Sequence, residues 1–124
     1  MADTTTIQQK IEDLIDYSDE RVWKFPKFYR FSIGQDIMRY LYQELELAVT
    51  ANKKYFKKTT LQDLDVANAV VQSLVRRALN TKYVDRSGAT RHLIDEHHYE
   101  VWSGKLQEIG RMIGGWIKSQ QAAK

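Results

Sequence analysis

The chain has 124 residues, 43% of them hydrophobic, which is enough for one domain with one core and too few for two. A net charge of +3 admits an acidic partner such as nucleic acid without requiring one, and the lack of cysteine excludes disulfides and thiolate metal sites. No apolar run is long enough for a membrane span, and residues 1–10 lack the pattern of a leader. We therefore expect one soluble domain, residues 1–124, with a cytoplasmic location and no membrane partner.

Charge is unevenly distributed along the chain. The first 20 residues contain six acids and one base, so the positive charge belongs to residues 21–124. The basic character therefore belongs to the later helices.

Four stretches have apolar residues at helical rather than strand spacing. The first, roughly residues 6–24, opens with Thr6 and Gln9, which have the spacing of a capping box. A corner is expected at Phe25-Pro26-Lys27, because proline fixes its own backbone and pushes the preceding residue out of helical geometry. The apolar stripe of this first helix consists of Ile7, Ile11, Leu14, Ile15 and Val22.

The second expected helix follows this corner. Its apolar pattern continues through Tyr55-Phe56, so we expect the helix to reach a basic end at Lys57-Lys58, where lysine suits the negative end of the helix dipole. Its stripe consists of Ile33, Ile37, Leu41, Leu45 and Ala48.

The third expected helix restarts at Thr59, whose spacing to Gln62 is again that of a capping box. The pattern fades near Tyr83, and residues 85–90, which contain Ser87-Gly88, are expected to form a loop. The stripe of this helix consists of Leu64, Ala67, Val71, Leu74 and Ala78.

The fourth expected helix begins near Asp95. Its apolar residues alternate three and four positions apart, which places two tryptophans, a tyrosine and three aliphatic residues on one narrow seam that must be buried. Four amphipathic helices with short connections predict an all-α protein, an antiparallel four-helix bundle. The seam consists of Tyr99, Trp102, Leu106, Ile109, Ile113 and Trp116.

Glycines cluster on this last helix. Gly110 and Gly114 lie four residues apart on one face, and Gly115 joins them beside Trp116. Glycine inside a helix costs about 0.5–1 kcal/mol relative to alanine, so the cluster predicts that another backbone approaches closely. That neighbour is either a second subunit or another helix of the same bundle, and the spacing does not separate the two.

Two basic clusters are the candidate nucleic-acid-binding residues. The first is expected on one helix end with no nearby acid, and the second lies on the third helix away from the centre of its seam. Phosphates would suit both clusters, although lysine runs are also common on solvated faces. The candidates are Lys53, Lys54, Lys57 and Lys58, and then Arg76 and Arg77.

The sequence contains no recognisable catalytic motif. Asp95 and His98 have the three-residue spacing of di-iron helices, but the further ligands such a centre needs are missing, and a capped helix start explains both residues. We expect a non-enzymatic protein with no catalytic residue, metal, cofactor or small-molecule substrate.

Two segments resemble a known family. They are Phe25-Pro26-Lys27 followed by Arg30-Phe31, and the run from Leu106 to Ile117 that contains Gly110, Arg111, Gly114 and Trp116. Together they resemble the accessory variability determinant of diversity-generating retroelements. That family lies within a wider group of small four-helix bundles, which includes proteins encoded by ribosomal-RNA intervening sequences.

The resemblance implies a barrel-like homopentamer that binds a reverse transcriptase and its template RNA, or DNA, and supports error-prone cDNA synthesis without doing chemistry itself. Arg76 falls where the family tends to place a basic residue, whereas Gln72, one turn earlier, is not basic here. The motif or interface residues that the resemblance marks are Phe25, Pro26, Lys27, Arg30, Gly110, Arg111, Gly114 and Trp116. The alternative is a self-assembling bundle of the intervening-sequence type without a reverse-transcriptase partner.

Overall fold

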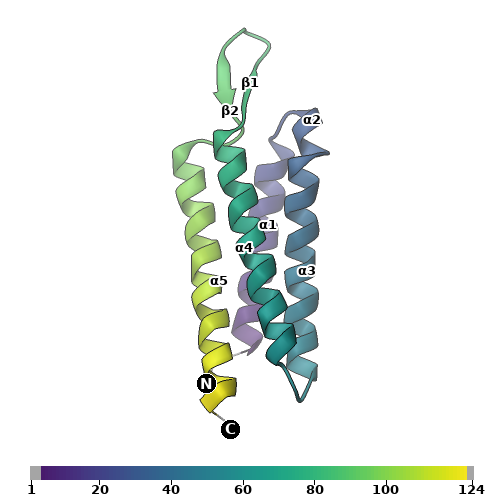
Figure 1. The fold of residues 1–124 in the computed structure, drawn as a ribbon. Helices are drawn as coiled ribbons and strands as arrows, with labels where there is room; N and C mark the ends of the chain where they lie inside the picture. Colours follow the sequence, from purple (N-terminus) through teal and green to yellow (C-terminus); the bar gives the residue numbers. More distant parts are fainter. Residues whose placement is uncertain (1–3, 123–124) are drawn as a thin grey trace.

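A computed structural model describes residues 4–122 as a bundle of long helices with a small hairpin at one end (Figure 1). Side-chain positions are described for residues 6–121. The elements in chain order are α1 (Thr4–Trp23), α2 (Lys27–Arg30), α3 (Ile33–Lys53), α4 (Lys58–Asn80), β1 (Lys82–Val84), β2 (Thr90–His92) and α5 (Glu96–Ala122). The prediction of an all-α bundle of four long helices is confirmed.

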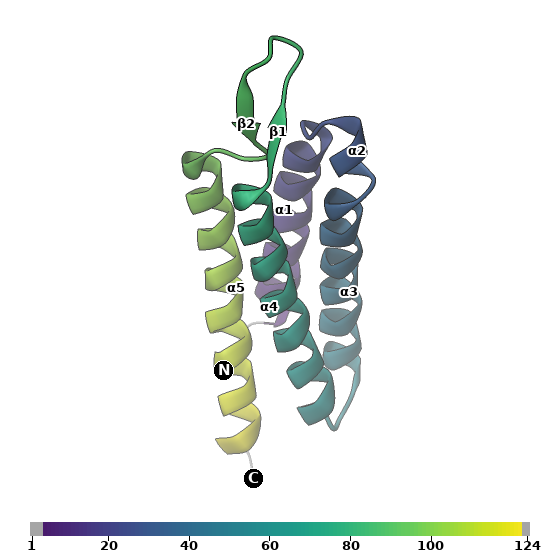
Figure 2. The same ribbon diagram turned by 45° about the horizontal axis from the view of Figure 1, so that its top comes forward.

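The four long helices run alternately up and down the bundle. Helices α1 and α4 each pack against both α3 and α5, so α1 and α4 occupy opposite corners. Helix α2 and the hairpin of residues 82–92 lie at the same end, as both ribbon views show (Figure 2). The corner between α3 and α4 lies at the other end.

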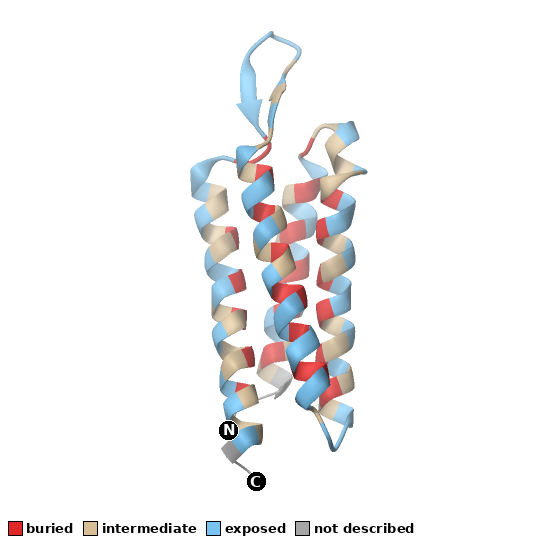
Figure 3. Cartoon of the chain, in the orientation of Figure 1, coloured by how far each residue is buried: buried red, intermediate tan, exposed pale blue. Residues whose placement is uncertain are grey.

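The core is built from the apolar stripes that the sequence predicts. The inward faces of the four long helices are buried, whereas the hairpin is almost wholly exposed (Figure 3). Trp102 and Trp116 are fully enclosed, while Tyr99 at the start of the α5 seam is half-buried. One core position carries a charged residue type, because Glu44 occupies the inner face of α3 between Leu41 and Ala48.

Both predicted capping boxes are wrong. Helix α1 already includes Thr4, so Thr6 lies within its first turn and not before it. Helix α4 begins at Lys58, so Thr59 also lies inside the helix, and the preceding residue makes no side-chain cap hydrogen bond. The spacing of threonine and glutamine is equally compatible with the first two turns inside a helix, which is where both pairs occur.

The expected extension of α3 to Lys58 is also wrong. The helix ends at Lys53, and Tyr55 and Phe56 lie in the connection, where they are 86% and 85% exposed.

The loop predicted after α4 is confirmed at its turn, but two short strands on either side of the turn were not predicted. These pair antiparallel, with Tyr83 opposite Arg91, and enclose a turn in which Gly88 has φ +87°.

Candidate nucleic-acid interface

The predicted lysine cluster surrounds the connection between α3 and α4, residues 53–58, which we call the lysine corner. Lys57 Nζ donates hydrogen bonds to the carbonyl oxygens of Ala51, at 2.6 Å, and Lys54, at 2.5 Å. These carbonyls belong to the end of α3, where oxygens lack helical partners and the dipole is negative. The four lysines therefore do not share one helix. Lys57 stabilises the end of α3 through its hydrogen bonds to these carbonyl oxygens.

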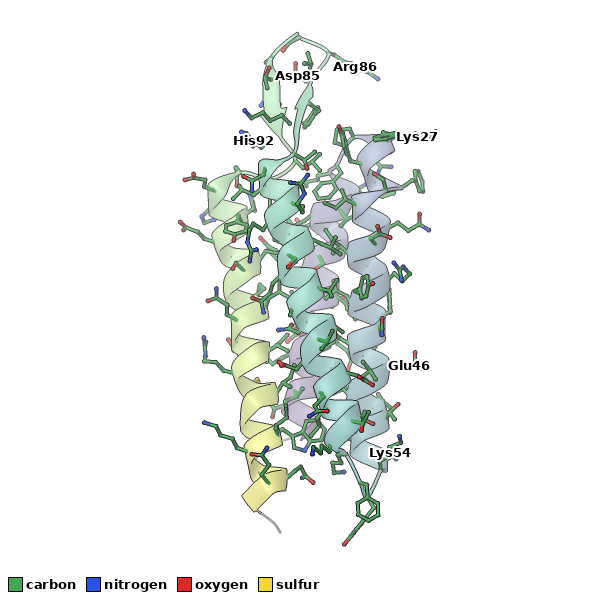
Figure 4. All side chains as sticks on the ribbon, viewed as in Figure 1. Lys27, Glu46, Lys54, Asp85, Arg86 and His92 are labelled. Carbon is green, nitrogen blue, oxygen red and sulfur yellow. The ribbon has the colours of Figure 1, made fainter. Side chains whose placement is uncertain are left out.

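The other three lysines of this corner are exposed. Within the described part of the chain Lys53, Lys54 and Lys58 form no ion pair, although Lys54 Nζ lies 3.5 Å from Thr60 Oγ1. Between them the rings of Tyr55 and Phe56 meet edge to face with centroids 4.9 Å apart. The corner thus presents free ammonium groups on both sides of an exposed aromatic pair (Figure 4, where Lys54 marks its position).

The second predicted cluster lies at the opposite end. Arg76 and Arg77 are exposed on the last turns of α4, next to the hairpin. A helix rises about 1.5 Å per residue, so Lys58 and Arg76 are separated by roughly 27 Å along α4. The structure therefore does not bring the two clusters together, and any ligand that contacts both must be extended.

The family-motif residues before α3 lie within residues 21–31, a segment that we call the α2 corner. Phe25 is buried, and the carbonyl oxygen of Pro26 accepts hydrogen bonds from the backbone amides of Tyr29 and Arg30, both at 2.9 Å. These two residues therefore hold the corner in shape. Lys27 lies on its exposed side (Figure 4).

Arg30 connects the α2 corner to the end of α1. Its guanidinium carbon lies 4.3 Å from the centroid of the Trp23 ring, and its Nη2 lies 3.4 Å from the carbonyl oxygen of Phe25. A cation over an indole face is attractive because of the ring quadrupole. The sequence predicted only a corner and a family motif in this segment, and the exposed aromatic side chains beside its cations were not predicted.

The glycines of α5 fall into two kinds. A Cβ added at Gly110 would lie 3.2 Å from Asn68 Nδ2, and that amide donates a hydrogen bond to the Leu106 carbonyl oxygen at 3.1 Å. Gly110 therefore allows close packing of α5 on α4 within one bundle. Gly114 and Gly115 have no such neighbour within 4 Å in the described part of the chain.

The other motif residues of α5 also differ in their surroundings. Trp116 is buried in the core, so its place in the motif is explained by packing. Arg111 is exposed.

The start of α5 has a local explanation. The Asp95 carboxylate accepts a hydrogen bond from the backbone amide of His98 at 2.8 Å and lies 2.7 Å from His98 Nδ1, and these bonds lower the pKa of Asp95. This is the geometry of an N-cap. Among the described residues, no group of three or more His, Asp or Glu side chains could hold a metal ion.

The hairpin is held by one carboxylate. Asp85 accepts hydrogen bonds from the backbone amides of Ser87 and Ala89 and from the Ser87 hydroxyl, and it pairs with Arg91. The Ser87 hydroxyl and the Arg91 guanidinium hold the pKa of this carboxyl well below its usual range. An open hollow of about 800 Å³ lies beneath the hairpin, with Arg21, Lys24 and His92 among its lining residues.

The described residues therefore define a class of protein: a small helical bundle with exposed basic and aromatic groups at both ends and no recognisable catalytic constellation. No helix in the described range has the length and apolar character needed to cross a membrane.

The chain matches the family model described as bAvd-like over residues 5–120 and belongs to that family. This confirms the resemblance to the accessory variability determinant, a family of accessory, non-catalytic proteins of diversity-generating retroelements. No curated protein matches the chain.

Proposed function

We propose that this protein is a non-enzymatic accessory factor of a diversity-generating retroelement that assembles with itself and binds the template RNA and the reverse transcriptase. The observation that carries the proposal is the family match, which spans residues 5–120. The exposed cations at both ends of the bundle support the RNA part, because phosphates supply most of the affinity of such complexes.

The phosphate contacts are assigned to exposed cations that form no ion pair in the described part of the chain. Lys53, Lys54 and Lys58 at the lysine corner and Arg76 and Arg77 at the end of α4 are exposed and form no ion pair within the described residues. Lys57 is set apart from them because its ammonium group already binds two carbonyl oxygens. The distance between the two clusters suits an RNA that runs along the bundle.

Salt is expected to control the affinity for RNA. Five phosphate contacts with a single strand predict a loss of about a hundredfold between 50 and 200 mM salt, and Lys58→Ala should reduce the slope by about 0.7. Fluorescence anisotropy of labelled template RNA measures both quantities. Affinity that is absent at low salt, or constant over this range, would contradict the phosphate contacts.

Lys57→Ala is the matched variant for this experiment. It removes the same charge but also the hydrogen bonds that close the end of α3, so it should lower the free energy of unfolding by about 1 kcal/mol. Lys58→Ala should leave stability nearly unchanged, because Lys58 is exposed and makes no such bond. Urea unfolding of both variants separates the structural lysine from the proposed ligand contact.

Self-assembly is tested at Gly114. In an isolated protomer Gly114→Ala meets open space and should raise the free energy of unfolding by about 0.5–1 kcal/mol, since alanine favours the helix. If α5 packs on a second copy here, Gly114→Leu should instead reduce the assembled mass measured by light scattering. A monomeric wild-type protein at micromolar concentration would contradict the proposed homo-oligomer, pentameric or other.

The alternative is a self-assembling bundle of the intervening-sequence type without a reverse-transcriptase partner. Co-purification of the chain with the reverse transcriptase encoded beside it favours the retroelement function. A gene position inside a ribosomal-RNA operon, with no reverse transcriptase nearby, favours the alternative.

A further inference from the structure

The α2 corner exposes three large aromatic side chains at one end of the bundle. Trp23 is 69% exposed, Phe28 73% and Phe31 64%. Scattered apolar residues are normal on a protein surface, but a cluster of large ones marks an interaction site. The corner is also firmly held, because Phe25 is buried beneath it and Tyr29 lies against Tyr83 of β1 with ring centroids 6.4 Å apart.

Cations are interleaved with these aromatics. Residues 21–31 contain four basic residues and no acid. Lys24 and Lys27 are exposed, and Arg30 places its guanidinium over one face of Trp23. Glu20, just before the segment, pairs with Arg21 at 3.2 Å and with Lys24 at 3.8 Å, whereas Lys27 and Arg30 form no ion pair among the described residues. The surface therefore offers flat apolar rings and unpaired positive charge, from Lys27 and Arg30, within one short segment.

We infer that the α2 corner is a site at which single-stranded nucleic acid stacks its bases on Trp23, Phe28 and Phe31. Lys27 and Arg30 then contact the phosphates between those bases. Proteins that hold single strands combine aromatic platforms with a positive surface in this way, whereas a duplex keeps its base faces covered. The inference rests on the proposed function for RNA as the ligand, and it adds that the RNA is unpaired where it meets this corner.

Two other occupants fit the composition of this corner less well. Lysine is depleted in protein interfaces, yet two lysines flank these aromatics. A symmetric contact between two copies of the corner would bring like charges together, which is unfavourable. The charge therefore favours a polyanion, and both protein occupants become outcomes of the test.

Trp23 provides a direct readout. Of the three tryptophans, Trp102 and Trp116 are buried and Trp23 alone is exposed. A base stacked on Trp23 quenches its emission, whereas binding elsewhere leaves it unchanged. We expect oligo(U) RNA of about 12 nucleotides, a length that covers such a site, to quench the exposed component, and a duplex of the same length to quench it far less.

Single substitutions test the platform. Phe28→Ala and Phe31→Ala should each weaken binding of labelled oligo(U) about tenfold, and Trp23→Ala at least as much, because one stacked base contributes about that factor. Trp23→Phe keeps a ring and should restore most of the affinity. Tyr42→Ala is the matched control, because Tyr42 is an exposed aromatic on α3 outside the corner.

The outcomes separate this inference from the proposed function. If the alanine variants bind oligo(U) as the wild type does, with the same salt dependence, the stacking site is refuted and RNA binding stands. If the wild type binds no RNA at low salt, both are refuted.

Two further results would also overturn the inference. If the variants lose the reverse transcriptase but keep oligo(U), the corner is a protein-docking surface. If they change the assembled mass in light scattering, it is a contact between copies of this chain.

Discussion

Glu44→Leu is expected to raise the free energy of unfolding by about 3 kcal/mol at pH 7. Glu44 is fully buried on the inner face of α3, and neither of its carboxyl oxygens has a hydrogen-bond partner among the described residues. Burial raises its pKa from 4.5 to about 8, so the folded protein keeps this carboxyl protonated at neutral pH. Leucine removes the cost of burying the group and fills a similar volume.

The sign of the pH dependence follows from the same pKa values. Below about pH 4.5 Glu44 is protonated in both the folded and the unfolded state, so its titration takes nothing from the free energy of unfolding. Between pH 4.5 and about 8 the unfolded chain ionises while the folded protein does not, so stability falls by about 1.4 kcal/mol per pH unit. Above the folded pKa no further loss is expected.

Urea unfolding at pH 5 and pH 8 measures this effect in the wild type, Glu44→Leu and Glu44→Gln. Glutamine keeps the shape and polarity of the side chain but cannot ionise, so it isolates the titration from the packing. In both variants the free energy of unfolding should no longer show the part of the decrease from pH 5 to pH 8 that comes from Glu44. An equal difference in wild type and Glu44→Gln would show that this carboxyl does not ionise on unfolding.

Gly34→Ala is expected to lower the free energy of unfolding by about 1–3 kcal/mol. An added Cβ would lie 2.7 Å from Val22 Cγ1 and 3.1 Å from the Tyr29 carbonyl oxygen. Val22 is buried and branched at Cβ, so it has little room to move, and the carbonyl belongs to the α2 corner. The substitution should therefore disturb this corner as well as the packing of α1 on α3.

Gly104→Ala is the control for this prediction. Gly104 also lies inside a long helix, but a Cβ there meets nothing within 4 Å in the described structure. It should stabilise the protein by about 0.5–1 kcal/mol through helix propensity alone. Thermal and urea unfolding of the two variants should give opposite signs, and equal effects would show that Gly34 is not closely packed.

Sequence spacing was sufficient for the long helices because it is a local property. Residues three and four apart share a helical face, so the stripes that contain Ile37, Val71 and Ile109 had to face a common core. The same rule extended α3 too far. Tyr55 and Phe56 continue the apolar pattern, but they lie beyond the end of α3, where no described helix covers them.

Glu44 was missed although a signal was present, and the hairpin was missed because its strands gave none. Glu44 lies three residues after Leu41 and four before Ala48, so its place in the stripe marked it as buried. The hairpin has strands of only three residues around Ser87-Gly88, too short for alternation to show. Its turn depends on Asp85 and on Arg91, whose pairing is seen only in the folded chain.

The sequence by itself determined the four-helix bundle, through apolar periodicity, and the family, through two short motifs. Only the tertiary structure decided which charges and glycines are free. In the folded protein Lys57 donates hydrogen bonds to backbone carbonyls, and Gly110 packs against Asn68, whereas a Cβ at Gly114 would meet no described atom within 4 Å. The physical reason is that exposure and partnership depend on neighbours from distant parts of the chain, which spacing along one helix does not encode.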